Sequence, residues 1–75
     1  HSGQNEFFVF LVGFSHNATP LVTISENDKP ICYRLPNEYS DWTMTVVGAA
    51  NMGERLFPSK VLFSLIGGRY LVDIL

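Results

Sequence analysis

The sequence has few of the residues on which the chemistry of small proteins depends. Cys32 is the only cysteine among 75 residues, so an intrachain disulfide and a thiolate-rich zinc site are both excluded. Because small secreted domains often rely on disulfides, this scarcity favours a reducing compartment such as the cytoplasm, or a domain that its partners stabilise. Of the two histidines, His1 is terminal and His16 lies in a polar segment.

Positive charge and long apolar runs are scarce as well. Five Lys and Arg residues stand against seven Asp and Glu residues, and the basic residues are scattered along the chain. Nucleic-acid binding requires several cations that face phosphates together, so a small nucleic-acid-binding β-barrel is only the alternative function. The longest apolar run, residues 7–14, is far shorter than the about 20 residues of a membrane-spanning helix.

Apolar side chains, by contrast, are abundant. Hydrophobic residues make up 47% of the chain and charged residues 16%, a composition that supports a packed core rather than disorder. The chain opens on His1-Ser2-Gly3 instead of methionine, which we interpret as an excised fragment whose anchor or targeting segment, if it has one, lies outside it. We expect a disordered or tag-derived start over residues 1–5 and a single β domain over residues 6–75.

Strand patterns and turn signals occupy both ends of this domain. Residues 6–14 are rich in β-forming side chains and predict the first strand. Residues 21–35 predict a hairpin, because an Asn-Asp turn separates two apolar runs. A Gly-Gly pair between residues 60–66 and residues 69–75 supplies the positive φ angles of a second tight hairpin, with Tyr70, Val72 and Ile74 facing the core.

The middle of the chain leaves two alternatives. Residues 42–46 alternate between apolar and polar, which predicts a strand with Trp42, Met44 and Val46 pointing inward. The alternative is a helix over residues 46–55, which alanines favour and two glycines disfavour. With the strand, the chain has about six short antiparallel strands, an all-β fold arranged as two small three-stranded sheets or as a small barrel.

No group of residues has the pattern of a catalytic or metal site. Ser15 and His16 are neighbours, and adjacent residues of an extended segment point to opposite sides, which argues against a nucleophile–base pair. Cys32 lies within a strand and is interpreted as a structural thiol. Glu26 and Asp28 lack the spaced ligands of a calcium loop. We therefore expect no enzyme, no cofactor and no metal ion, but a protein that presents a surface to another protein.

The first strand is the candidate for that surface, because both of its faces are apolar. Core packing accounts for one face. The other face, with Phe8, Phe10, Val12 and Phe14, requires either a covering element or a partner.

Several segments, taken in order, are similar to those of a known family. The apolar first strand runs into Val12-Gly13, a Pro-Leu-Val-Thr-Ile segment at residues 20–24 precedes a polar turn, and Tyr33-Arg34 closes that hairpin. Thr-Met-Thr-Val-Val at residues 43–47, Lys-Val-Leu-Phe-Ser at residues 60–64 and Gly-Arg-Tyr at residues 68–70 follow. In order and spacing, residues 7–75 resemble the periplasmic homology-region domain of the type II secretion inner-membrane clamp protein, its C component.

The resemblance implies a fold of two small three-stranded β-sheets and a non-enzymatic role in the periplasm, as a domain of an inner-membrane protein. It also implies a partner, the N-terminal periplasmic domain of the outer-membrane secretin. The positions that match the family's contact strands are Phe8, Phe10, Val12, Gly13 and Leu21.

Overall fold

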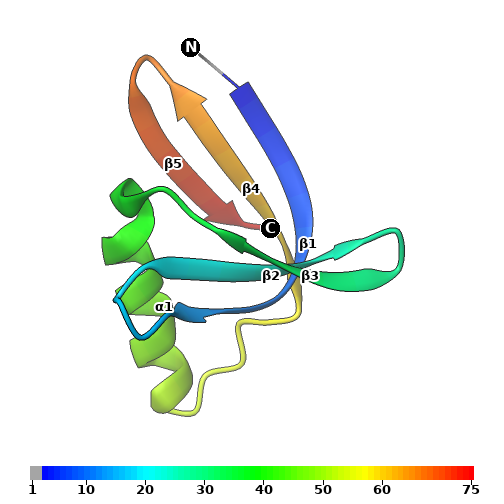
Figure 1. Cartoon of the computed structure of the whole chain (residues 1–75), viewed down its shortest axis with the longest axis vertical. Coiled ribbons are helices and arrows are strands. Elements are labelled where there is room, and N and C mark those ends of the chain that lie inside the picture. The colour runs from blue at the N-terminus through cyan, green and yellow to red at the C-terminus, as the bar shows by residue number, and fades with distance from the viewer. Residues whose placement is uncertain (1–2) are drawn as a thin grey trace.

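The computed structural model describes residues 3–75. Five strands form one open antiparallel sheet in the order β3-β2-β1-β4-β5, and a single helix packs beside it (Figure 1). The strands are β1 (Gly3–Phe14), β2 (Pro20–Glu26), β3 (Lys29–Arg34), β4 (Ser59–Ile66) and β5 (Arg69–Ile74). A 3-10 turn, η1 (Asn37–Tyr39), leads into the helix α1 (Ser40–Asn51). The fold is mostly β, as predicted, but the sheet is not a closed barrel.

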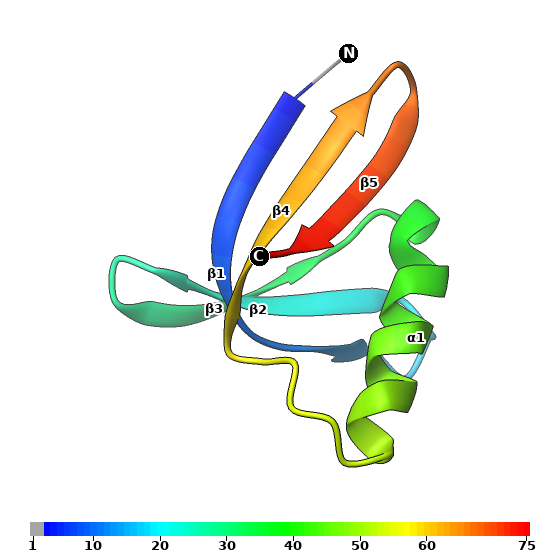
Figure 2. The same cartoon turned by 180° about the vertical axis from the view of Figure 1, so that it is seen from behind.

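β1 joins two three-stranded halves of the sheet. Up to Val9 it pairs with β4, which pairs with β5; from Val9 onward it pairs with β2, which pairs with β3. The halves extend in different directions, so the sheet has two arms that diverge at β1 (Figure 1 and Figure 2). The prediction of two separate three-stranded sheets from about six strands was therefore wrong, because five strands form one continuous sheet in which both halves share β1. The strand begins at Gly3, so residues 3–5 belong to it, while His1 and Ser2 lie outside the described residues.

A β-bulge marks the point where the arms diverge. Val9 lies opposite Ile24 and Val12 lies opposite Val22, so β1 uses one residue more than β2 over the same distance, and Phe10 is the extra residue. Side chains directly opposite each other in an antiparallel pair share a face. Val9 and Val12 therefore both face the core, although residues three positions apart lie on opposite faces of a regular strand.

The bulge overturns the expected alternation of the first strand. We expected Val12 and Phe14 on the same face as Phe8 and Phe10. Beyond the bulge the phase is reversed, and Val12 packs against the core cluster. The prediction that continued a strict period of two through Phe10 was wrong, because no residue type in this segment indicates a bulge.

Both predicted hairpins are confirmed. In the β2–β3 turn, Asn27 and Asp28 have φ angles of 51° and 63°; in the β4–β5 turn, Gly67 and Gly68 have φ angles of 58° and 78°. Positive φ at both central residues gives a two-residue turn whose twist matches that of the flanking strands. Asn, Asp and Gly are the residues that tolerate this backbone conformation.

The middle of the chain is helical, and the predicted strand over residues 42–46 is wrong. Thr43 has no exposed surface and Met44 is 65% exposed, the reverse of the expected pattern. The buried residues Tyr39, Thr43 and Val46 have the spacing of one helix face. Thr43 is accommodated there because its hydroxyl donates a hydrogen bond of 2.8 Å to the carbonyl oxygen of Tyr39, one turn earlier.

Gly53 ends this helix. Its φ angle is 91°, its N–H donates to the carbonyl of Ala50, and the N–H of Glu54 donates to the carbonyl of Ala49. This pair of hydrogen bonds around a left-handed residue is a common helix stop. The alternative prediction, a helix over residues 46–55, therefore named the right structure with bounds placed too late along the chain.

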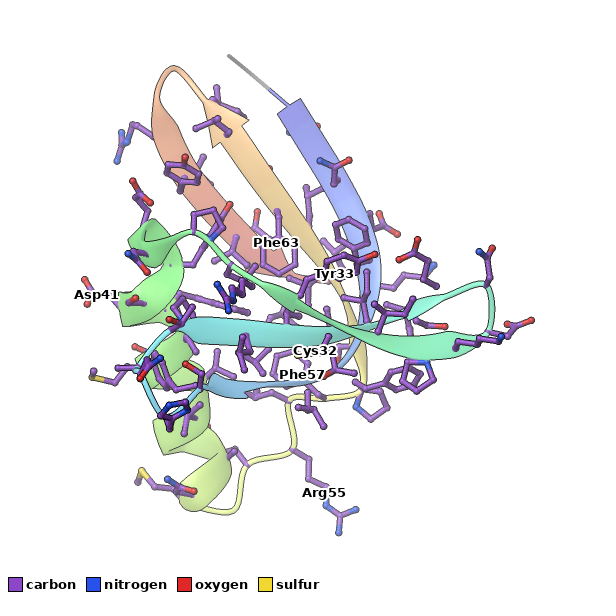
Figure 3. The ribbon with its side chains drawn as sticks, viewed as in Figure 1. Cys32, Tyr33, Asp41, Arg55, Phe57 and Phe63 are labelled. Carbon is purple, nitrogen blue, oxygen red and sulfur yellow. The ribbon has the colours of Figure 1, made fainter. Side chains whose placement is uncertain are left out.

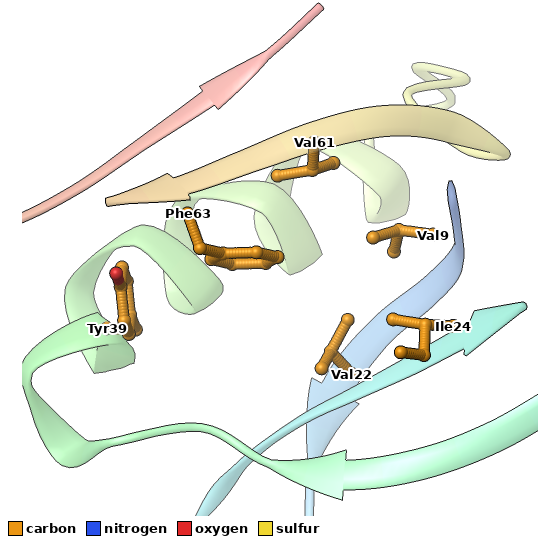
Figure 4. Packing of buried hydrophobic residues seen from close by; sticks show 6 residues of the cluster. All are labelled: Val9, Val22, Ile24, Tyr39, Val61 and Phe63. Atoms are coloured by element: carbon orange, nitrogen blue, oxygen red, sulfur yellow. The ribbon is translucent and has the colours of Figure 1, made fainter. Parts of the chain in front are cut away.

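The core lies in the angle between the two arms. It consists of Val9, Val22, Ile24, Tyr39, Val61 and Phe63 (Figure 4). The rings of Tyr39 and Trp42, at the start of the helical segment, meet Phe63 edge-to-face at centroid distances of 5.5 Å and 5.8 Å. Because such aromatic pairs add stability beyond burial alone, they fix η1 and α1 against the β4–β5 arm.

β5 reaches only the margin of this core. Val72 packs against it, and the ring of Tyr70 meets Tyr39 at 5.4 Å. Tyr70 and Ile74 are nevertheless 37% and 38% exposed, so the expectation that both face the core was only partly right. The reason is their place on an edge strand that the helix does not cover.

Candidate protein-interaction surface

The residues considered for catalysis or metal binding are dispersed. His16 is exposed in the turn after β1, and the Ser15 hydroxyl accepts two backbone N–H groups of that turn at 3.2 Å and 3.1 Å. Cys32 is an exposed thiol on β3. Within residues 3–75 no three His, Cys, Asp or Glu side chains come together as metal ligands. No helix in the described part of the chain is long and apolar enough to cross a membrane.

The acidic residues of the β2–β3 turn have structural roles. The Tyr33 hydroxyl donates a hydrogen bond to the carboxylate of Glu26 across the hairpin. This hydrogen bond is the main reason why the pKa of Tyr33 is raised above its ordinary value, with desolvation and the charge of Glu26 acting in the same direction. Asp28 occupies the second left-handed position of the turn.

The five residues assigned to partner contact lie in different surroundings. Phe8 and Phe10 are 41% and 38% exposed, and their rings meet edge-to-face at 5.4 Å. Gly13 and Leu21 are half-buried and lie opposite each other in the β1–β2 pair. Val12 packs against the core. Of the five, Phe8 and Phe10 are the two that present large apolar surface to solvent.

Leu11 is the exposed residue that sequence reasoning missed. It is 56% exposed and adjoins Phe10. Alternation from Phe8 and Phe10 places Leu11 inward, but the bulge puts it opposite Thr23, on the face away from Val12 and Val22. Predicting the exposure of Leu11 would have required knowledge of the bulge, and the residue types in this segment do not indicate one. We call Phe8, Phe10 and Leu11 the β1 patch.

The β1 patch lies where the arms diverge and has a mixed border. On β4, Lys60 lies opposite Phe8 and forms an ion pair with Glu6, with 3.9 Å between Nζ and Oε1. Elsewhere the patch continues into a shallow depression lined by Val46 of α1 and Phe57 of the loop that follows. An apolar centre with a charged rim is the usual anatomy of a protein interface.

A larger cleft opens in the angle between the N-terminal half of β1 and the β2–β3 hairpin. Its volume is about 630 Å³. Its apolar lining comes from both arms and from the start of the helical segment: Phe7, Val22, Ile24, Leu35, Tyr39 and Phe63. Figure 3 labels Tyr33 and Phe63, which reach this cleft from different arms. The charged side chains in the lining are Glu26 and Arg34, one of each sign.

Tyr39 joins the helical segment to the β4–β5 arm beside this cleft. Its hydroxyl lies 3.2 Å from the carbonyl oxygen of Ser64 and 3.2 Å from that of Leu71, and donates its proton between them. Burial raises the pKa of Tyr39 above its ordinary value, and the nearby Tyr70 adds to the shift. The neutral hydroxyl is therefore the form that the fold favours.

Comparisons with known proteins found no match: no family model, no curated protein and no solved structure matches the chain. The resemblance to the clamp-protein domain accordingly depends on the order and spacing of the chain's own residues.

Proposed function

We propose that this chain is a non-enzymatic protein-interaction module that docks onto a partner protein through the β1 patch. The observation that carries the proposal is the cluster of three large apolar side chains, each more than a third exposed, at one place on a small domain. Burying apolar surface contributes about 25 cal/mol per Å², so such a cluster favours association. Phe is also among the residue types that are enriched at the core of protein interfaces.

We assign the partner from the family resemblance. It is the N-terminal periplasmic domain of an outer-membrane secretin, and the chain is then the periplasmic domain of an inner-membrane protein in a type II secretion-like assembly. Two three-stranded halves that share β1 are compatible with the pair of small sheets that the resemblance implies. Gly13 and Leu21, half-buried on β1 and β2, would extend the contact beyond the β1 patch.

The test compares charge placed on the β1 patch with charge placed elsewhere. Phe8→Asp and Phe10→Asp should each weaken binding to a purified secretin N-terminal domain by about tenfold or more, because a carboxylate would be buried against apolar surface. The matched control is Met44→Asp, which changes another exposed apolar residue, 65% exposed on α1, and should leave affinity unchanged. Isothermal titration calorimetry measures the affinities, and circular dichroism confirms that each variant is folded.

The ionic strength of the titration separates this proposal from nucleic-acid binding. An apolar docking site should keep its affinity as salt rises, whereas binding to phosphates weakens steeply. The docking proposal fails if Met44→Asp is as harmful as Phe10→Asp. The assignment of the secretin as partner fails if the unmodified chain shows no binding to that domain.

A further inference from the structure

The N-terminal half of β1 has an edge with no strand beside it. Residues 3–9 pair with β4, and pairing with β2 begins only at Val9, so among the described residues no strand pairs with residues 3–7 on the side away from β4. An unpaired strand edge presents a row of backbone N–H and C=O groups that another extended chain can satisfy.

The alternation of the antiparallel ladder identifies the backbone groups at this edge. The N–H of Leu75 donates to the carbonyl of Lys60 at 2.9 Å, so the even-numbered residues of β4 direct their backbone groups toward β5. Its odd-numbered residues then face β1, where their register partners are the odd-numbered residues of that strand. Gln4 and Glu6 consequently direct their N–H and C=O groups away from β4, toward the free edge.

The free edge borders the 630 Å³ cleft. Asn5 and Phe7, neighbours of the two free backbone positions, line the cleft, and so do Ser25 and Glu26 at the end of β2, where that strand leaves β1. Phe7 is still 37% exposed, so part of the apolar lining is open to solvent. The single acidic and single basic side chains of the lining balance in charge, and Glu26 is already engaged by the hydroxyl of Tyr33.

We propose that this edge and cleft form a second binding site, separate from the β1 patch, which captures a short, uncharged, extended segment of another protein by strand addition. The segment lies along residues 3–7, forms backbone hydrogen bonds with Gln4 and Glu6, and places alternate apolar side chains in the cleft. Strand addition of this kind takes its affinity from the main chain and its specificity from pockets for every second side chain.

The geometry favours a single extended segment over other occupants. A small apolar molecule would fill the cleft and leave the backbone groups of Gln4 and Glu6 unused. A second copy of the chain would also bring its own β2–β3 hairpin, which projects on the side of the free edge (Figure 1), so both hairpins would have to pass the paired strands. A lone segment carries no such hairpin.

The test uses the whole 75-residue chain and a synthetic probe. The probe is a fluorescent peptide in which valine and threonine alternate between two terminal serines. Two further peptides carry N-methyl groups on every valine or on every threonine nitrogen. Because alternate N–H groups of a strand point to opposite edges, one methylated peptide should bind like the parent and the other should lose binding, as followed by fluorescence anisotropy.

Proline at the free edge tests the protein side. Glu6→Pro removes an N–H that is directed away from β4 and should weaken peptide binding by about tenfold or more. Glu6→Thr keeps that N–H and is the matched control, with binding unchanged. Should Glu6→Pro fail to fold, Gln4→Pro removes the other N–H of the same edge. Phe10→Asp, in the β1 patch, should leave peptide binding unchanged, so failure here is distinct from failure of the docking proposal.

Three results would overturn the inference. Equal binding of both methylated peptides would indicate a site that recognises apolar side chains alone. A dimer of the chain in sedimentation velocity that Glu6→Pro dissociates would assign the edge to a second copy. No binding of the parent peptide to the unmodified chain would show that the edge does not accept a strand.

Discussion

The two halves of β1 differ in composition and pair with different strands. Residues 3–9 pair with β4 and leave their other edge beside a cleft, whereas residues 11–14 pair with β2 on the opposite side of the strand. The first half begins with the small or polar residues Gly3-Gln4-Asn5-Glu6, whereas residues 10–14 are apolar apart from Gly13. Where the partner changes, one extra residue, Phe10, reverses the phase of the side chains that follow it. An alternating sequence pattern therefore predicts a strand, but it does not predict a β-bulge. The bulge determines which face each later side chain occupies.

Deletion of Val12 is the strongest test of this comparison and should have the largest effect. With Val12 removed, Gly13 takes the position opposite Val22 and Phe14 turns to the other face, so the core loses Val12 while the phase of the rest of the strand changes. We expect a loss of several kcal/mol, comparable with the about 5–15 kcal/mol of stability typical of a domain, and no cooperative thermal unfolding. Deletion of Phe10, the extra residue, keeps Leu11 opposite Thr23 and Val12 opposite Val22, so this matched control should unfold cooperatively. Equal melting temperatures for the two deletion variants would contradict the assignment of Phe10 as the extra residue.

Alanine substitutions on the two arms test whether the halves are one folding unit. Val61 of β4 has no exposed surface and Val22 of β2 is 4% exposed, and both belong to the same core cluster. Val61→Ala and Val22→Ala should each lower the free energy of unfolding by about 2 kcal/mol, through lost burial and the cavity left behind. In urea denaturation followed by Trp42 fluorescence and by circular dichroism, each variant should show one coincident transition. Two separate transitions would mean that the arms unfold independently.

Tyr39→Phe should have a smaller effect that depends on pH. Loss of the hydrogen bond to the β4–β5 arm should cost about 1 kcal/mol at neutral pH. Because the pKa of Tyr39 is raised in the fold, the stability linked to its neutral form is complete below the unfolded pKa and is lost as pH rises through the folded pKa.

The measurement for Tyr39 is the free energy of unfolding from urea titrations between about pH 7 and about pH 11, the range that brackets tyrosine ionisation. Stability of the unmodified chain should fall at the alkaline end, and the decline should be shallower for Tyr39→Phe. Identical alkaline slopes for the two proteins would disprove the assignment.

Tyr33→Phe should have the smallest effect. Tyr33 is 44% exposed, and its hydrogen bond to Glu26 lies at the surface of the hairpin. Exposed pairs of this kind contribute little, so we expect no measurable change in the free energy of unfolding at neutral pH in the same urea titration. If Tyr33→Phe lowered the free energy of unfolding as much as Tyr39→Phe, the two hydroxyls would contribute equally to stability. That result would contradict the prediction, which rests on their different burial.

The predicted elements succeeded where a local rule determines the backbone. The Asn27-Asp28 and Gly67-Gly68 turns were found because few residue types tolerate positive φ, and the strands beside them followed. The middle segment failed because Trp42, Met44 and Val46 satisfy a period of two by chance. The decisive residue is Thr43, a polar side chain whose hydroxyl is satisfied by its own helix and can therefore be buried.

The candidate surface was predictable only in part. The sequence predicted exposure of Phe8 and Phe10, because the first strand has aromatic residues on both faces and the core of the domain covers only one of them. Leu11 was missed and Val12 was misplaced for the same reason, the bulge at Phe10. The cleft beside residues 3–8 could not be anticipated, because it is made by side chains from three parts of the chain that meet only when the sheet bends.

By itself, the sequence determined the β character of the chain, its two tight hairpins and an apolar first strand in excess of the needs of a core. These features depend on φ preferences and on side-chain periodicity, which act over a few residues. Only the tertiary structure decided that β1 serves both arms, that residues 40–51 form a helix, and that Leu11 rather than Val12 faces solvent. Each of these outcomes depends on which residues meet across the sheet, and such contacts are selected by burial of the whole core rather than by neighbours in the chain.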